Sequence, residues 1–368
     1  MHRLRDIIQI AENLASFDLA YDWDNVGLQI GDYDQEIKDI MLTLDTNEKV
    51  IDEAISKGCQ LIISHHPFIF KPLEKINFQD KKGKIIYKII KNNINLLVMH
   101  TNLDLANGGL NDYLFEILGL KDKDFLEYHT ESTLYKLVCF IPYESFEKVK
   151  MAILNSGAGQ IAKYSHSSFS TKGKGTFKPL SGSNPYIGKE NTMQELDEIR
   201  FETIVSKKYL DKIIEKLKEV HAYEKVAYDV FSLSNQDLKY GLGRIGKTYK
   251  EIKLIEFIDL IKKRLNILEM KYVGKDSKLI KNVALCTGSG AKLISLASEK
   301  GAELYITSDI KYHEAQLAED LGIALLDIGH YHSEVIVKKL FYDYFLENIQ
   351  NINLYISETQ TNPWNYST

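Results

Sequence analysis

The sequence predicts an α/β protein in which two duplicated α/β lobes form one domain, interrupted by a ferredoxin-like α+β insert. Strand-like and helix-like segments alternate at both ends of the 368-residue chain, a pattern typical of mostly parallel sheets. The two ends also resemble each other, whereas the middle follows a different pattern. We expect a first lobe at 1–128, the insert at 129–235, and a second lobe at 236–368 that packs with the first.

The first lobe contains three short apolar runs separated by helical periodicity. The runs predict buried strands at residues 40–44, 61–63 and 96–99. Between them, apolar residues recur at helical spacing over 50–55, where Gly58 ends the helix, and over 85–90. The resulting βαβαβ order predicts parallel strands with helices on the faces of the sheet.

The last 90 or so residues repeat this alternation. Apolar runs predict strands at 283–286, 304–306, 324–326 and 354–356, and a helix at 335–346. Residues 56–65 align with 299–308, and 94–100 align with 323–330. Chance similarity between short apolar strands is the alternative, but the shared Lys-Gly pair and the shared strand-end histidine favour duplication.

The middle of the chain predicts a separate insert. Strands are expected at 134–140, 200–205 and 228–231, helices at 149–154 and 210–220, and a Gly/Ser-rich loop at 156–185. The order β-α-loop-β-α-β suggests a split βαβ, ferredoxin-like unit.

Composition narrows the class of protein and its partners. A net charge of −5 argues against nucleic acid as a partner. Cys59, Cys139 and Cys286 lie far apart beside apolar strands, as reduced core residues do. No apolar run approaches the roughly 20 residues of a membrane span, and the N-terminus lacks the apolar core of a signal peptide. We therefore expect a soluble, cytoplasmic protein without a membrane partner.

Six of the ten histidines fall in four short motifs, each directly after a predicted strand. The motifs are Ser64-His65-His66-Pro67, His100-Thr101-Asn102-Leu103-Asp104, residues 309–313 and residues 329–334. Ligands of a parallel sheet gather beyond the carboxyl ends of its strands. Histidine and carboxylate are the ligands that zinc, iron and manganese take in proteins. The motifs thus predict a metal site built from distant parts of the chain.

The spacing within the motifs suggests two metal ions. Neighbouring residues on a strand point to opposite sides, so His65 and His66 would serve two metals. His330 and Glu334 are four residues apart and would share one helix face. Together with Asp104 they make a five-ligand set, too large for one tetrahedral zinc and suited to two ions bridged by a carboxylate.

Each of these residues also has a purely structural interpretation. A histidine at a strand end is more often a hydrogen-bonded loop residue, which suits His129, His166 and His221. Taken alone, Asp104 would cap a helix and Glu334 would be a first-turn carboxylate. The Gly288-Ser289-Gly290 segment would either cradle a phosphate or make a tight turn.

Seven ordered sequence blocks resemble the Nif-three-like dinuclear-metal family, whose members are often named GTP cyclohydrolase I type 2 or its homologues. The blocks are residues 24–31, 64–67, 100–104, 241–246, 288–290, 307–313 and 329–334. The resemblance implies two divalent ions per chain on His65, His66, Asp104, His330 and Glu334, and a toroidal homohexamer. The insert resembles a PII-like or CutA-like domain. Ser308 and Ala222 depart from the glycine and proline expected there.

The predicted function is a dinuclear-metal-dependent hydrolase with a small-molecule substrate. The family label implies GTP cyclohydrolase-type ring opening, and a nucleotide, phosphoester or cyclic amide would suit the same metals. His100 lies close enough to Asp104 in sequence to act as the catalytic acid/base or to orient a ligand. Zinc, iron and manganese all fit the ligand set. The alternative is a non-catalytic hexameric sensor or scaffold that binds metal or an effector.

Overall fold

The computed structural model describes residues 2–128, 134–161, 164–234 and 240–365. Their contacts divide the chain into two compact units, Met1–Tyr128 with Tyr240–Thr368, and His129–Lys239. The boundary expected at residue 129, including His129, and that expected at 235–236 lie outside the described residues. None of the described helices combines the length and the apolar character needed to cross a membrane.

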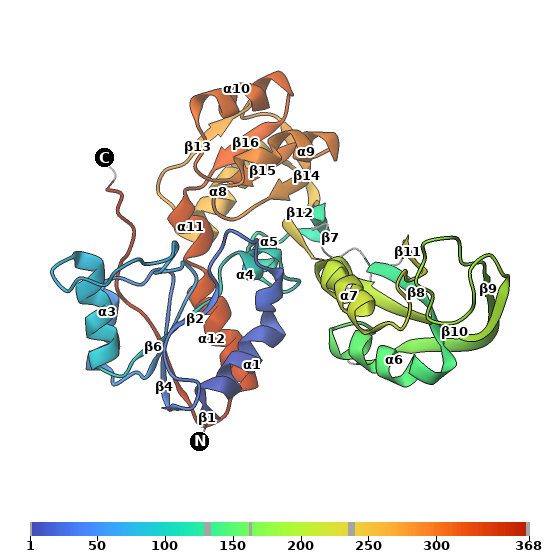
Figure 1. Ribbon diagram of the computed structural model, residues 1–368. Helices are drawn as coiled ribbons and strands as arrows, with labels where there is room; N and C mark the ends of the chain where they lie inside the picture. Colours follow the sequence, from blue (N-terminus) through green and yellow to red (C-terminus); the bar gives the residue numbers. More distant parts are fainter. Residues whose placement is uncertain (1, 129–133, 162–163, 235–239, 366–368) are drawn as a thin grey trace. The chain divides into compact units, whose positions relative to one another are not determined.

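A five-stranded sheet with the order β17-β4-β5-β6-β2 organises the first half of the first unit. Figure 1 labels its strands β2, β4 and β6. The strands β4 (Asp39–Thr43), β5 (Leu61–Ser64) and β6 (Asn95–Val98) are parallel, and β2 (Gly27–Ile30) runs antiparallel to β6. Every residue of β5 and β6 is buried, which explains their continuous apolar sequence. A small ribbon of β1 (His2–Arg3) and β3 (Glu36–Ile37) lies beside this sheet.

Helices cover both faces of this sheet. The apolar residues of α2 (Glu48–Ser56) and α3 (Lys81–Lys91) pack on one face, and those of α1 (Leu4–Leu14) and α12 (Val337–Asn348) on the other. The C-terminal strand β17 (Asn353–Ile356) pairs with β4 in parallel. The assignment of residues 335–346 and 354–356 to the second lobe was therefore wrong, because their partners are α1 and β4 of the first.

A six-stranded sheet with the order β13-β16-β15-β14-β12-β7 forms the other half of this unit. The strands β14 (Leu279–Leu285), β15 (Leu304–Thr307) and β16 (Ala324–Asp327) are parallel, as predicted. The remaining strands, β7 (Lys121–Tyr128), β12 (Gly241–Lys253) and β13 (Lys271–Val273), run antiparallel to their neighbours. One face carries α5 (Leu110–Ile117) and α8 (Leu254–Leu265), and the other carries α9 (Ile294–Glu299) and α10 (Tyr312–Asp320). The predicted α/β class is confirmed.

The second unit is a four-stranded antiparallel sheet with the order β11-β8-β10-β9 and two helices on one face. Along the chain its elements are β8 (Leu134–Pro142), α6 (Phe146–Asn155), β9 (Ser168–Phe177), β10 (Gln194–Ser206), α7 (Lys207–Val220) and β11 (Tyr228–Ser232). The loop expected over 156–185 was wrong for the residues of β9. This edge strand is largely exposed and is held by pairing with β10, so its sequence carries no apolar alternation.

The three cysteines are free and buried, as expected. Each belongs to a different apolar cluster of the described residues. Burial raises the pKa of the Cys59 and Cys139 thiols to about 12, so these thiols stay protonated and inert at neutral pH.

Candidate metal centre

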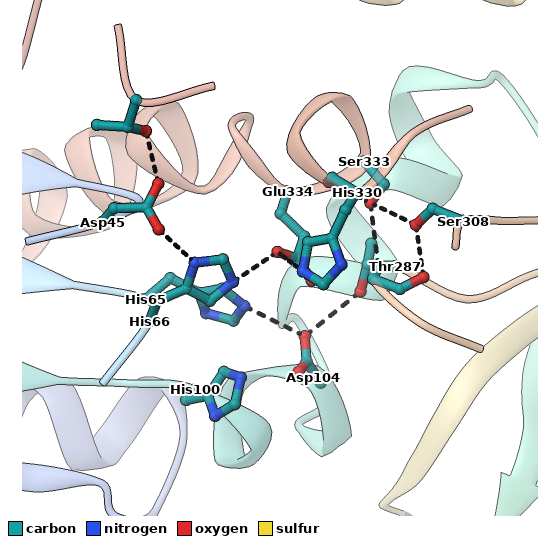
Figure 2. A network of polar contacts seen from close by, with 12 residues as sticks. Asp45, His65, His66, His100, Asp104, Thr287, Ser308, His330, Ser333 and Glu334 are labelled. Atoms are coloured by element: carbon teal, nitrogen blue, oxygen red, sulfur yellow. Dashed lines mark hydrogen bonds and ion pairs between the residues drawn. The ribbon is translucent and has the colours of Figure 1, made fainter. Parts of the chain in front are cut away.

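The structure brings the five predicted ligands and His100 together where the two sheets of the first unit meet (Figure 2). His65 and His66 follow β5, and His100 precedes α4 (Thr101–Leu105), which carries Asp104. His330 and Glu334 begin and end α11, the short helix after β16. All of them stand beyond the carboxyl ends of parallel strands, the position at which α/β sheets assemble binding sites.

Two overlapping groups of donor atoms make up the centre. His65, His66 and His100 form one, and His66, His330 and Glu334 form the other; within each, one donor atom per residue lies within 4.8 Å of the others. Glu334 Oε2 lies 2.8 Å from His66 Nε2 and 2.9 Å from His330 Nε2. Asp104 Oδ1 lies 3.8 Å from His65 Nε2. His66 belongs to both groups and therefore links them.

The orientation expected for the histidine pair was wrong. β5 ends at Ser64, so the strand alternation that would separate His65 from His66 does not extend to them. Their ring centroids are 5.3 Å apart, and both side chains reach the same centre (Figure 2).

Each of the four histidines is held through its Nδ1 atom by an oxygen that can only accept a hydrogen bond. The pairs are His65 with the Met99 carbonyl at 2.7 Å, His66 with Asp45 at 2.7 Å, His100 with Asp24 at 2.9 Å, and His330 with Asp309 at 2.7 Å. Nδ1 must then carry the proton, which leaves the Nε2 lone pair of a neutral ring for the centre. Ligating histidines in metalloproteins are held by such partners.

His65 is the donor whose surroundings most clearly fit a cation. Its side chain is completely buried, and its Nε2 atom has no hydrogen-bond partner among the described residues. Asp104, at 3.8 Å, is too distant for a hydrogen bond. Burial lowers the pKa of His65 to about 3, so the ring is neutral at physiological pH. A buried lone pair without a partner is costly, and a divalent cation would satisfy it.

The remaining groups show that the centre is rich in negative charge. Burial by itself would lower the pKa of His66, yet hydrogen bonds with Asp45 and Glu334 raise it to about 10. A hydrogen bond with Glu334 is the main cause that raises the pKa of His330 to about 9. Burial and the charge of Glu334 raise the pKa of Asp104 to about 7. These carboxylates draw protons onto the histidines, which a divalent cation would displace.

The Gly288-Ser289-Gly290 segment makes a tight turn that fits against Glu334. The Gly288 amide donates to Ser333 Oγ at 3.0 Å, and the Gly290 amide donates to Thr307 Oγ1 at 3.0 Å. Because both amides are engaged, the phosphate-cradle alternative is not supported. Gly288 has φ +62°, and a Cβ atom there would stand 2.3 Å from Glu334 Oε1, so only glycine fits. The unexpected Ser308 donates from Oγ to the Gly288 carbonyl at 2.6 Å and closes the turn.

Comparison with known proteins identifies the family. The family model described as Duf34/NIF3 (NGG1p interacting factor 3) matches residues 2–363. The chain belongs to the Duf34/NIF3 family. A Bacillus subtilis protein named GTP cyclohydrolase 1 type 2 homolog is 38% identical over 365 residues, or 98% of each chain. A Halalkalibacterium halodurans protein of the same name is 39% identical over 333 residues, covering 90% of this chain and 89% of its own.

Two crystal structures of similar proteins match the whole chain. A Bacillus cereus protein related to NIF3 has a TM-score of 0.70 at 36% identity, and a Staphylococcus aureus protein has a TM-score of 0.76 at 31% identity. Each comparison covers 100% of this chain and 99% of the other. The resemblance inferred from the seven sequence blocks is confirmed.

Three residues of this Duf34/NIF3 centre were not predicted to act there. Asp24 lies in a motif but had no assigned role, Asp45 was not singled out, and Asp309 was noted without a partner. Asp45 directly follows the apolar run 40–44, and this position at a strand end could have identified it. In the motif 309–313, His313 contributes nothing to the centre, because it lies exposed on α10 and bonds Gln316.

Asparagine at Asp45 or Asp309 is expected to weaken metal binding about 10- to 100-fold. Each substitution removes the charge that fixes His66 or His330 through Nδ1. Zinc titration against a competing chelator measures the change. Asp52→Asn is the control, because Asp52 is 57% exposed and pairs with Lys88 on the surface. Unchanged affinity in both variants would show that these carboxylates do not orient ligands.

Proposed function

We propose that this chain is a dinuclear-metal-dependent hydrolase. One observation carries the proposal: four histidines anchored at Nδ1 lie together with two carboxylates. His66 and His330 meet Glu334 through Nε2, His65 Nε2 lies 3.8 Å from Asp104, and His100 shares a donor group with His65 and His66. The ions would be held by His65, His66, Asp104, His330 and Glu334. A histidine and carboxylate set without cysteine suits zinc, iron or manganese.

The sheet topology supports two ions rather than one. In each sheet three parallel strands follow chain order, and an antiparallel strand flanks the third. After that third strand come His100 and Asp104 in one sheet and His330 and Glu334 in the other, four residues apart in both cases. We infer a duplicated α/β unit, each copy of which supplies one histidine and one carboxylate from a helix.

His100 is the residue that we propose moves a proton. When bound, a pair of divalent ions supplies Lewis-acid polarisation of the bond under attack and acidifies water. The buried Asp24 carboxylate orients the His100 ring, and the side chain is 18% exposed, so it can exchange protons with solvent and substrate at Nε2. Although burial would raise it, hydrogen bonds from His100 and Thr101 lower the pKa of Asp24 to about 2. Asp24 therefore stays charged and holds the Nδ1 side of the His100 ring.

The substrate class that we propose is a nucleotide or a related phosphate or cyclic amide. The printed name of the relatives, GTP cyclohydrolase 1 type 2 homolog, supports ring opening of the GTP type. Exposure of the side chains rises from 4% at Glu334 to 25% at His66 and 38% at His330. A substrate would therefore enter from the His330 side.

Hydrolysis of GTP and other nucleotides by protein loaded with zinc, manganese or ferrous iron tests the proposal. Turnover should require metal and disappear with chelator. His100→Ala should lower kcat about 10²- to 10⁴-fold with its metal content retained. His313→Ala, at the exposed histidine of α10, is the matched control. Metal binding without turnover of any nucleotide, phosphoester or cyclic amide would contradict the hydrolase.

A cavity in the second unit favours an effector-binding role as the second candidate. It has a volume of about 650 Å³ and lies on the sheet face opposite the helices, with Phe177, Tyr186 and Tyr223 among its lining residues. This size is ordinary for small-molecule sites. The element order of this unit supports a ferredoxin-like, PII-like insert. In this candidate the chain is a metal- or effector-binding sensor or scaffold, and the homohexamer implied by the family is its assembly.

A further inference from the structure

Three aromatic side chains stand together beside the metal centre, and two of them leave much of their surface in solvent. We call Tyr21, Trp23 and Phe70 the aromatic platform. The rings of Tyr21 and Trp23 stack, with centroids 5.5 Å apart and planes 12° apart, and the Phe70 centroid lies 6.0 Å from that of Trp23. Trp23 is 59% exposed and Phe70 is 42% exposed. Apolar groups gathered at a surface in this way mark binding sites more often than isolated exposed residues do.

The platform is fixed to the centre by contacts with His100 and Thr101. The Trp23 ring stands edge-on to the His100 ring, with centroids 6.5 Å apart and planes 78° apart. The side chain of Asp24, next in sequence, is fully buried and bonds both His100 and Thr101. The Tyr21 amide donates to Thr101 Oγ1 at 3.2 Å. The loop that carries Trp23 therefore cannot move without moving Asp24, which orients His100.

Packing within this unit does not account for the platform. None of its three residues belongs to the apolar clusters formed by the described core. An indole with 59% of its surface exposed gives up most of the burial free energy that its size would provide. What an exposed indole offers is a flat π surface on which another ring can stack.

A cation stands at the Tyr21 end of the platform. Lys292 Nζ lies 5.4 Å from the Tyr21 ring centroid, and Lys292 is exposed just after the Gly288-Ser289-Gly290 turn that packs against Glu334. The second sheet thus contributes a positive charge beside aromatic rings contributed by the first. A ring compound that also carries negative charge complements both features.

We propose that the aromatic platform binds the planar heteroaromatic ring of an anionic substrate, with Trp23 stacked on the ring and Lys292 beside the anionic group. The inference rests on the proposed function and deepens it, because it narrows the substrate to compounds such as nucleotides. It places that ring next to His100, the residue proposed to transfer the proton.

Tryptophan fluorescence reports directly on this site. The chain has two tryptophans, and the second, Trp364, is 74% exposed near the C-terminus. In a Trp364→Phe background, saturable quenching of Trp23 by GMP is expected, excited where the nucleotide does not absorb. Ribose 5-phosphate, which lacks the ring, should not quench. Guanosine, which lacks the phosphate, should quench with weaker affinity, and Lys292→Met should remove the advantage of GMP over guanosine.

Calorimetric measurement of dissociation constants gives a second test. Trp23→Ala should raise the Kd of GMP about 5- to 150-fold, the range that loss of one base–aromatic stack produces, and should leave the Kd of ribose 5-phosphate and the metal content unchanged. Tyr249→Ala, at a 72% exposed tyrosine of β12, is the control and should change neither Kd.

Three results would overturn the inference. The first is the absence of quenching by GMP, and the second is equal quenching by GMP and ribose 5-phosphate. The third is a Trp23→Ala variant with an unchanged GMP Kd; if the mass of its assembly in light scattering also differs from wild type, the platform is an interface between copies. Because binding is measured without turnover, failure of the hydrolase proposal alone would leave the expected quenching in place.

Discussion

Replacing Arg244 by methionine is expected to lower the free energy of unfolding by about 3–5 kcal/mol. Arg244 is fully buried in β12 and makes a two-pronged ion pair with Asp112 of α5, at 2.6 and 2.9 Å. The same guanidinium donates to the carbonyls of Gly241, Gly243 and Ala106. Methionine fills the volume but removes the two-pronged donor from the buried Asp112 carboxylate, which keeps only Lys123 and the Gly108 amide, and it leaves these carbonyls without the guanidinium.

Urea unfolding measures this loss. Lys247→Met is the matched control on the same strand, because the pair of Lys247 with Asp122 is exposed and 3.6 Å long; it should change stability by less than about 1 kcal/mol. An Arg244→Met variant as stable as the control would show that the buried pair does not stabilise the fold.

The same pair predicts a loss of stability in acid. Burial alone would raise the pKa of Asp112, but hydrogen bonds from Arg244 hold it below its usual value. A carboxyl with a lowered folded-state pKa adds stability above its unfolded pKa of about 3.9. That stability is lost as pH falls through the lower, folded pKa. Asp112→Asn should therefore reduce the fall in unfolding free energy at acid pH, measured by urea unfolding at several pH values. An unchanged fall would show that other carboxyl groups cause it.

Glutamine at Glu334 is expected to reduce metal-dependent hydrolysis by at least about a hundredfold, the upper end of the loss from removing a partner of a metal ligand. Glu334 Oε2 lies between His66 Nε2 and His330 Nε2. The carboxylate therefore belongs to one donor group and contacts the other through His66, which both groups share. Burial would raise its pKa, yet hydrogen bonds from His330 and His66 hold that pKa well below its usual range. Glutamine keeps the shape and removes the charge.

Initial rates with saturating metal and nucleotide test this substitution. Glu319→Gln on the exposed side of α10 is the control and should behave as wild type. Rates within twofold of wild type in Glu334→Gln would remove Glu334 from the proposed ligand set.

The predictable part of the fold was the buried parallel strands. β5 and β6 are covered on both faces, so continuous apolar runs mark them. β9 and β12 are partly exposed and owe their place to pairing with β10, β7 and β14, which leaves little trace in local sequence. Periodicity identified the helix and strand at the C-terminus but could not reveal their partner sheet, because α12 and β17 find theirs more than 300 residues earlier in α1 and β4.

The expectation that ligands lie beyond the carboxyl ends of parallel strands identified the histidines that the centre brings together. Histidine is far scarcer in this chain than aspartate and glutamate, so histidines that follow strands are easily recognised. This expectation missed Asp24 and Asp45 for the same reason, since single aspartates at loops are common. Their role becomes visible only in the structure, where Asp24 contacts His100 and Asp45 contacts His66.

Metal content by elemental analysis, on protein purified without chelator, tests the central claim most directly. About two ions per chain are expected in the wild type and in the Asp52→Asn surface control, and a large loss is expected in His65→Ala/Glu334→Ala. That double variant removes the buried Nε2 without a described partner and the carboxylate between His66 and His330. Less than one ion per chain in the wild type, or equal content in the double variant, would contradict the dinuclear centre.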